Sequence, residues 1–157
     1  MDASRRAETA SAPDADSSYE VDSFCGYKFG CDYRRPNWSN GYSSMSPDVV
    51  RVRLERPFRN FKAATLTHGK AGLQSVLLHY YDEMHAMKDE DLDAEVAAVK
   101  GILEKKYGIK FDNSTAQRGK MFFAVHKSGS GIRLEVTNRA VARRGQNFGA
   151  DGGADVL

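Results

Sequence analysis

The sequence is poor in cysteine, and this scarcity excludes a scaffold built on disulfides. Only two cysteines, Cys25 and Cys31, occur in 157 residues, and small disulfide-dependent domains carry more. In an extended segment the two would stand roughly 20 Å apart, so a bridge between them would need a turn at Gly26 or Gly30. We expect two reduced, half-buried thiols, and a bridge from Cys25 to Cys31 is the alternative.

Long apolar runs and nucleotide-binding motifs are also missing. No run of about 18 apolar residues occurs, so no membrane-spanning helix is predicted. The first residues lack the apolar core of a secretory signal peptide, which makes a cytoplasmic location the default expectation. The Gly69-Lys70 pair lacks the upstream glycine of a phosphate-binding loop and is not followed by Ser or Thr. We therefore expect no cofactor.

Large apolar side chains are absent or rare at both ends of the chain. Residues 1–18 are rich in Ala, Ser and Asp, and residues 145–157 are rich in Gly. Such segments bury too little apolar surface to offset the entropy lost on ordering, so both are predicted to be disordered. Residues 19–144 are predicted to form a single domain, since the hydrophobic share of 41% and the charged share of 28% are ordinary for a globular protein.

The middle of the chain contains a series of apolar runs that are typical of strands. Val50, Val52 and Leu54 alternate with charged residues, which is the period-two pattern of a strand buried on one face. Two pairs of runs are joined by glycine-containing connections, 68–72 and 128–131, which predict hairpins. The predicted strands cover residues 24–29, 50–55, 60–67, 73–81, 120–127 and 132–137, with a polar loop over 32–45.

One helix is predicted, beginning at Asp89 and ending before Gly108. Carboxylates crowd its start, where they suit the positive end of the helix dipole, and Lys105 and Lys106 stand in its last turn. The apolar residues that repeat along one stripe are Leu92, Val96, Val99 and Leu103. A single stripe indicates that the helix covers one face of a sheet. The order of elements predicts an α+β fold, with an antiparallel or mixed sheet of about five to seven strands and one main helix packed on one face.

Two short motifs resemble small uncharacterised bacterial α+β domains. Residues 24–30 (Phe-Cys-Gly-Tyr-Lys-Phe-Gly) look like the strand with which those domains open, and residues 103–108 (Leu-Glu-Lys-Lys-Tyr-Gly) look like the end of their helix. The resemblance implies an α+β fold and a bacterial origin. It implies no function, because no activity is assigned to those domains.

The densest group of potential metal ligands lies between His79 and His85. A divalent ion needs three or four converging nitrogen or carboxylate ligands. The candidates here are His79, Asp82, Glu83 and His85. The two histidines are six residues apart, unlike the two that share a helix face in His-Glu-x-x-His. We therefore favour an exposed strand end followed by a polar loop over a metal site.

Other candidate catalytic groups have simpler structural interpretations. The acidic run from Asp89 to Glu95 has a sufficient role at the start of a helix. Residues 128–131 (Ser-Gly-Ser-Gly) are shifted from the Gly-x-Ser-x-Gly motif and lie between two predicted strands, so we interpret them as a hairpin turn. No catalytic residue is predicted, and an enzymatic role is left open but not favoured.

Positive charge is unevenly distributed along the chain. Residues 24–70 carry nine basic and three acidic side chains, and residues 107–148 carry eight and two, so each segment has a net charge of +6. Residues 81–106 have a net charge of −4, and the two acidic tails reduce the total to +2. If the helix covers one sheet face, the strand alternation sends several arginines to the opposite face.

This uncovered face and the loop over residues 32–45 form the predicted binding surface. Arg and aromatic residues are enriched where proteins bind each other tightly. The predicted contact residues are Arg34, Arg35, Trp38, Arg51, Arg53 and Arg133. We expect a non-catalytic module that binds an acidic protein partner. The alternatives are single-stranded nucleic-acid binding by the same face, a small metal-dependent enzyme using the group from His79 to His85, and an ordinary solvated face. The oligomeric state is left open.

Overall fold

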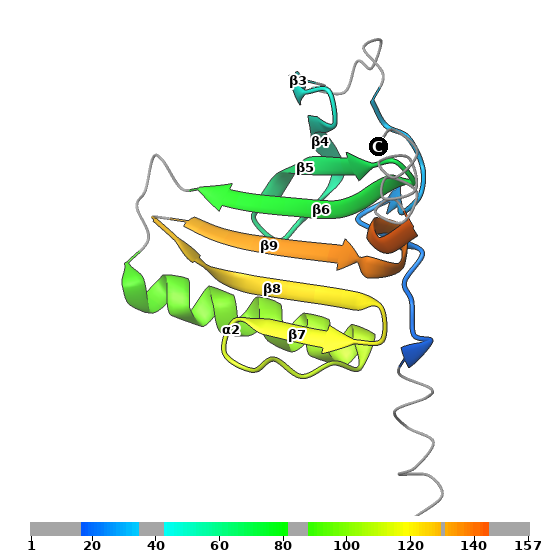
Figure 1. The fold of residues 1–157 in the computed structure, drawn as a ribbon. Coiled ribbons are helices and arrows are strands. Elements are labelled where there is room, and N and C mark those ends of the chain that lie inside the picture. Colours follow the sequence, from blue (N-terminus) through cyan, green and yellow to red (C-terminus); the bar gives the residue numbers. More distant parts are fainter. Residues whose placement is uncertain (1–16, 35–42, 82–87, 130, 145–157) are drawn as a thin grey trace, which may run out of the picture.

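The largest element of the structure is a seven-stranded antiparallel sheet with strand order β3-β4-β5-β6-β9-β8-β7 (Figure 1). The computed structural model describes residues 17–34, 43–81, 88–129 and 131–144. The strands are β3 (Ser43–Ser46), β4 (Val49–Phe58), β5 (Phe61–Gly69), β6 (Gly72–Tyr81), β7 (Thr115–Arg118), β8 (Met121–Ser128) and β9 (Gly131–Asn138). The one main helix is α2 (Asp89–Tyr107), so the predicted α+β fold is confirmed.

Both predicted hairpins are present. Strands β5 and β6 pair from Ala64 with Leu78 to Gly69 with Gly72, and β8 and β9 pair along their whole length. The two hairpins are joined by a long-range pairing of β6 with β9, which places residues 75–81 beside residues 131–137. This central pairing makes one continuous sheet from the two halves of the chain.

The single strand predicted over residues 24–29 is wrong. The segment folds as a tight hairpin of two short strands, β1 (Ser23–Phe24) and β2 (Tyr27–Lys28). Its two turn residues, Cys25 and Gly26, have φ angles of 53° and 85°. Positive φ at both central positions is the geometry of a two-residue hairpin turn. The turn lets Phe24 and Tyr27 both point into the core.

Two short strands were not predicted. Strand β3 lies at the end of the predicted loop over 32–45, and β7 is a four-residue segment with only one apolar side chain, Ala116. Both are edge strands. Each is only four residues long and therefore leaves little periodicity for the sequence to reveal.

Helix α2 begins and ends where the sequence predicts. Three carboxylates stand in its first turn and two lysines in its last. Gly108 follows in the left-handed conformation, with φ of 64°, and its N–H bonds the carbonyl of Glu104 at 2.9 Å. The buried positions of the predicted stripe are Leu92, Val99 and Leu103, with Val96 partly buried.

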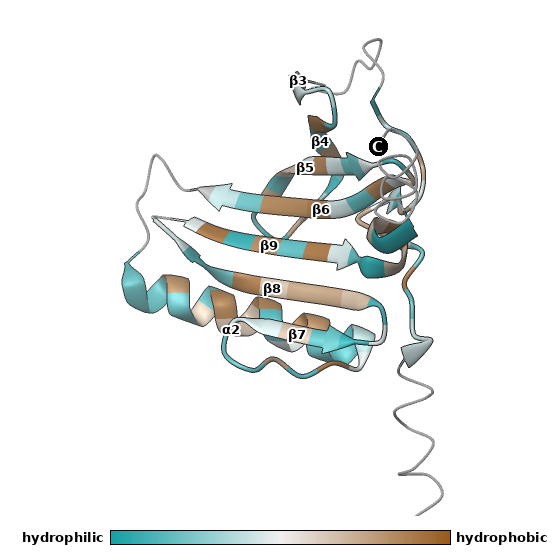
Figure 2. Ribbon diagram, in the orientation of Figure 1, coloured by the Kyte–Doolittle hydropathy of each residue, from teal (hydrophilic) through white to brown (hydrophobic). Residues whose placement is uncertain are grey.

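The helix lies along one side of the sheet, packed against β8 and β9 (Figure 1). Two ion pairs fix it there: Arg59 in the β4–β5 turn bonds Glu95 at 2.6 and 2.9 Å, and Lys127 of β8 bonds Asp93 at 2.9 Å. Figure 2 shows apolar and polar residues alternating along β6 and β9. The apolar set faces the helix and forms one continuous core.

The N-terminal segment covers the part of this core that the helix leaves uncovered. Phe24 packs on Tyr107 at the end of α2, with ring centroids 6.3 Å apart. Gly30 and Cys31 exchange backbone hydrogen bonds with Leu73 at 2.8 and 2.7 Å. A Cβ atom at Gly72 would lie 2.4 Å from the Gly30 carbonyl oxygen, so this close approach requires glycine. Within the described residues, no helix is both long enough and apolar enough to span a membrane.

Candidate binding face and the His68 cluster

The side of the sheet opposite α2 carries the polar half of the strand alternation, and we call it the open face. On β4, Val50 and Val52 are buried towards the helix, whereas Arg51 and Arg53 are exposed on the other side. The same parity continues across β5, β6, β9 and β8. The central open-face residues are Arg51, Arg53, Ala63, Thr65, Leu77, His79, Phe122, Ala124, His126, Arg133 and Glu135.

The strand register aligns several basic side chains in one row across the open face. Arg53 pairs with Ala63. The row continues from Ala63 to His79, because the adjacent Ala64 pairs with Leu78 in the antiparallel ladder. His79 pairs with Arg133, and Arg133 pairs with His126. Side chains directly opposite each other in such pairs have Cβ atoms about 5 Å apart, so His79 and Arg133 are immediate neighbours.

His79 lies within the electrostatic reach of two arginines from different strands. Burial lowers the pKa of His79, and the positive charges of Arg133 and Arg51 lower it further. Within the described residues, the guanidinium groups of Arg51 and Arg133 form no ion pair or hydrogen bond. The open face therefore holds two uncompensated positive charges around one neutral imidazole.

The carboxylate nearest to Arg133 on its own strand is engaged elsewhere. Glu135 accepts a hydrogen bond from the Ser75 hydroxyl at 3.1 Å, and Ser75 accepts one from Thr137 at 3.2 Å. These contacts hold Glu135 towards the opposite end of β9 from Arg133. Nearby, the guanidinium of Arg139 lies 4.8 Å from the ring centroid of Phe122 and covers this aromatic side chain.

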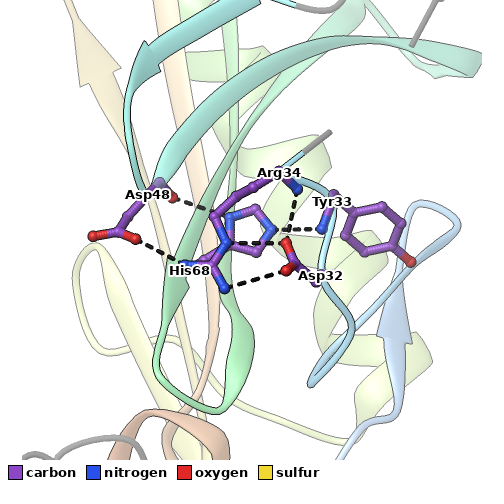
Figure 3. Close-up of polar contacts among 5 residues, drawn as sticks. All are labelled: Asp32, Tyr33, Arg34, Asp48 and His68. Carbon is purple, nitrogen blue, oxygen red and sulfur yellow. Dashed lines mark hydrogen bonds and ion pairs between the residues drawn. The ribbon is translucent and has the colours of Figure 1, made fainter. Parts of the chain in front are cut away.

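Arg34 lies outside this row, in a polar cluster at the end of β5 (Figure 3). Its guanidinium bonds Asp32 at 2.9 Å and Asp48 at 2.8 Å. The hydrogen bonds from Arg34 lower the pKa of Asp32 to about 2. Asp48 precedes Arg51 by three residues, or about 10 Å along an extended strand. The charge of Arg34 is thus compensated locally, away from the open face.

His68 is the buried centre of this cluster, only 3% exposed. The backbone N–H of Tyr33 donates to His68 Nε2 at 3.1 Å, so Nε2 must be unprotonated. The hydrogen therefore lies on Nδ1, which donates to the Asp48 carbonyl at 3.0 Å (Figure 3). Burial is the main reason that the pKa of His68 is lowered. A neutral imidazole thus joins two chain segments that precede and follow residues 35–42.

The structure brings together only part of the predicted site. Arg51, Arg53 and Arg133 lie on one face, as the alternation predicted, whereas Arg34 belongs to the His68 cluster. Arg35 and Trp38 lie outside the described residues. Sequence reasoning did not place His79 on the binding face, although the alternation of Ser75, Leu77 and His79 along β6 carries that signal.

The predicted metal candidates and cysteines can be placed in part. His79 lies in β6, whereas Asp82, Glu83 and His85 lie outside the described residues. The part of the chain that the structure describes contains no group of three or more His, Cys, Asp or Glu side chains that could hold a metal. Cys25 and Cys31 are unbridged, and burial raises the pKa of the Cys25 thiol to about 11.

Comparison with known proteins adds no relative to this picture. Neither the scan against protein-family models nor the searches of curated proteins and of solved structures find a match to this chain. A functional assignment therefore depends on the open face and on the His68 cluster.

Proposed function

We propose that this protein is a non-catalytic binding module whose open face contacts an acidic protein partner. The observation that supports this most is the pair of uncompensated arginines, Arg51 and Arg133, on either side of His79. Arginine is favoured in protein interfaces because its planar guanidinium can bind a carboxylate through two parallel hydrogen bonds. An acidic partner would supply carboxylates to these two groups, since the open-face carboxylate of Glu135 is engaged by Ser75.

A protein partner is favoured over single-stranded nucleic acid by the aromatic content of the open face. Proteins that bind single strands usually stack bases on exposed aromatic rings. Phe122, the aromatic side chain at the centre of the open face, is already covered by the Arg139 guanidinium. Among the open-face side chains that the structure describes, positive charge is available but an uncovered stacking platform is not.

A binding role is also favoured over catalysis because both ring nitrogens of the buried His68 are occupied. A general base needs a nitrogen that can accept a proton from a substrate. Both ring nitrogens of His68 already bond backbone groups, those of Tyr33 and Asp48. His68 therefore acts in the fold, where it connects two segments.

The test is charge reversal on the open face. We expect Arg51→Glu and Arg133→Glu each to weaken binding of a fluorescein-labelled 20-residue poly-glutamate peptide by about tenfold or more, measured by fluorescence anisotropy. Lys110→Glu, in the exposed connection between α2 and β7, makes the same charge change elsewhere and is expected to have a small effect. Thermal unfolding followed by circular dichroism verifies that each variant is folded.

Two results would contradict the proposal. An equal loss of binding in Lys110→Glu would mean that the peptide responds to net charge and not to the open face. Binding of a 20-nucleotide oligo-dT with no binding of the peptide would replace the protein partner with a single-stranded nucleic acid.

A further inference from the structure

We propose that the acidic partner of the open face is the outer side of helix α2 in a second copy of this chain. This inference rests on the proposed function, because it names the partner that the open face would bind. The helix lies on one side of the sheet and the open face on the other (Figure 1). Two copies would therefore associate head to tail, through two different surfaces.

The open face offers a space of the right width for a helix between two arginines. Arg51 on β4 shares a row with Thr65 and Leu77, and Arg133 lies on β9. Neighbouring strands are about 4.8 Å apart, so β4 and β9, with β5 and β6 between them, are roughly 14 Å apart at the backbone. An α-helix with its side chains is about 10–12 Å across. One helix can thus lie above β5 and β6 with an arginine on each side.

The outer side of α2 differs from that of most surface helices, which is charged or polar. Its central part carries small, uncharged residues on the side opposite the buried Leu92, Val99 and Leu103. Ile102, which is 37% exposed, lies at the margin of this surface. The small outer residues are Ala94, Ala97, Ala98 and Gly101. Such side chains allow a helix to approach the surface of a sheet closely.

The charged residues within this part of α2 are engaged by its own molecule. Glu95 bonds Arg59 in the β4–β5 turn, and Lys100 bonds the carbonyl of Asn113. Neither has to lose water or a partner for the small outer residues to be covered. The outer side is therefore available for contact with a second copy.

The first turn of α2 provides carboxylates for the arginines of the open face. Glu90 and Asp91 are exposed and, like Arg51 and Arg133, form no ion pair or hydrogen bond within the described residues. Asp93, in contrast, is paired with Lys127. One molecule thus carries uncompensated carboxylates on one side and uncompensated arginines on the other. These two surfaces are complementary in charge between copies.

The two surfaces also match along their length. Arg133 and Thr137 are four residues apart on β9, or about 14 Å in an extended strand. Glu90 and Ala98 are eight residues apart in α2, or about 12 Å along the helix axis. A helix with Glu90 beside Arg133 therefore places its small residues over the uncharged row that contains Thr137 and Ser75. Helix α2 already lies lengthwise beside β8 on the covered side, so this packing repeats one that the fold uses (Figure 1).

Sedimentation equilibrium of the full chain tests the proposal. One helix on a sheet is a small interface, so the average mass should rise above the 17.4 kDa of one chain between about 10 μM and about 1 mM. A face variant, Arg51→Gln with Arg133→Gln, and a helix variant, Ala94→Lys with Ala97→Lys, should each weaken the association about tenfold or more. Arg143→Gln with Arg144→Gln removes two exposed arginines elsewhere and should associate like the wild type. Circular dichroism verifies that each variant is folded.

Mixing the two variants identifies a head-to-tail contact. The face variant keeps an intact α2 and the helix variant keeps an intact open face. An equimolar mixture should therefore form a dimer with one copy of each that grows no further, although each variant alone stays at the mass of one chain. Absence of this dimer would overturn the proposal, as would a wild-type protein that is monomeric at about 1 mM.

The peptide experiment separates this result from that of the proposed function. A monomeric wild-type protein whose binding to poly-glutamate is weakened by Arg51→Glu would exclude the second copy and support another acidic protein as the partner. Unchanged peptide binding in both Arg51→Glu and Arg133→Glu would overturn the proposed function, and this inference with it.

Discussion

At the scale of single residues, the hydrogen bonds of His68 require its imidazole to be neutral. Nε2 accepts from the Tyr33 N–H and Nδ1 donates to the Asp48 carbonyl. Protonation would place a second donor opposite the Tyr33 N–H and would put a charge in a site that is 3% exposed. The fold therefore stabilises the neutral imidazole, which is the physical meaning of its lowered pKa.

This state predicts a loss of stability in mild acid. Because the pKa of His68 is lowered on folding, the unfolded chain binds more protons than the folded chain below the ordinary histidine pKa of about 6.5. Its contribution to the free energy of unfolding is complete above that pH and is lost as the pH falls through the folded-state pKa. Urea unfolding followed by circular dichroism at several pH values between about 8 and 5 measures this loss.

The matched variant for this prediction is His68→Gln. Glutamine can accept the Tyr33 N–H but does not titrate, and the variant loses the hydrogen bond from His68 Nδ1 to the Asp48 carbonyl. Its free energy of unfolding at pH 8 should therefore be lower by about 1 kcal/mol. It should then vary less with pH than the wild type in the same range. A wild-type protein with constant stability down to about pH 5 would contradict this account of His68.

The arginines show which part of the site a sequence can predict at this scale. Period-two alternation correctly assigned Arg51, Arg53 and Arg133 to the side opposite the buried residues of their strands. It could not predict that Arg34 is compensated by Asp32 and Asp48, because the contact with Asp48 joins residues fourteen positions apart that only the fold brings together. Residue type alone does not distinguish a compensated arginine from an uncompensated one.

At the scale of elements, two glycines in and after α2 differ in whether an alanine could replace them. Gly101 lies exposed inside α2, and an added Cβ atom would meet nothing within 4 Å. Gly108 has φ of 64°, and an added Cβ would lie 2.6 Å from the Arg118 guanidinium, which bonds the Tyr107 carbonyl. The first glycine weakens the helix without a packing reason, whereas the second ends it.

Alanine substitutions at these positions should therefore have opposite effects. Gly101→Ala should raise the free energy of unfolding by up to about 1 kcal/mol, the difference in helix propensity. Gly108→Ala should lower it by about 1–2 kcal/mol, because alanine in the left-handed conformation is strained and Arg118 must move. Urea midpoints of the two variants and the wild type provide the measurement. A destabilised Gly101→Ala would mean that this side of the helix is covered by something in solution.

Elements were predictable where they were long or carried clear end signals. Strands β4, β5, β6, β8 and β9 and helix α2 have apolar repeats over at least eight residues each. The β1–β2 hairpin was not predictable, because its turn requires Cys25 to adopt positive φ, which residues other than glycine rarely do. Strand β7 was not predictable because it has little apolar content.

At the scale of the whole molecule, the arrangement that matters most for the open face is the pairing of β6 with β9. Each strand belongs to a local hairpin, but their mutual pairing joins residues 50 to 62 positions apart and places His79 beside Arg133. Local periodicity contains no information on which strand edges meet, so the row across the open face could not be derived from the sequence. It depends on the central pairing together with the registers of β4 with β5 and of the two hairpins.

Two adjacent phenylalanines of β8 test directly whether α2 covers one face of the sheet and leaves the other face open. Phe123 is 0% exposed and packs on Tyr107 of α2, with centroids 5.3 Å apart, whereas Phe122 points to the open face under Arg139. Phe123→Ala should cost about 3–5 kcal/mol, because it leaves a cavity between helix and sheet. Phe122→Ala should cost only about 1 kcal/mol, from a partly exposed cation–π contact. Since a domain of this kind is stabilised by roughly 5–15 kcal/mol, both variants should be measurable by urea unfolding. Equal losses would mean that a second layer covers the open face, and the arginines there would not be available to any partner.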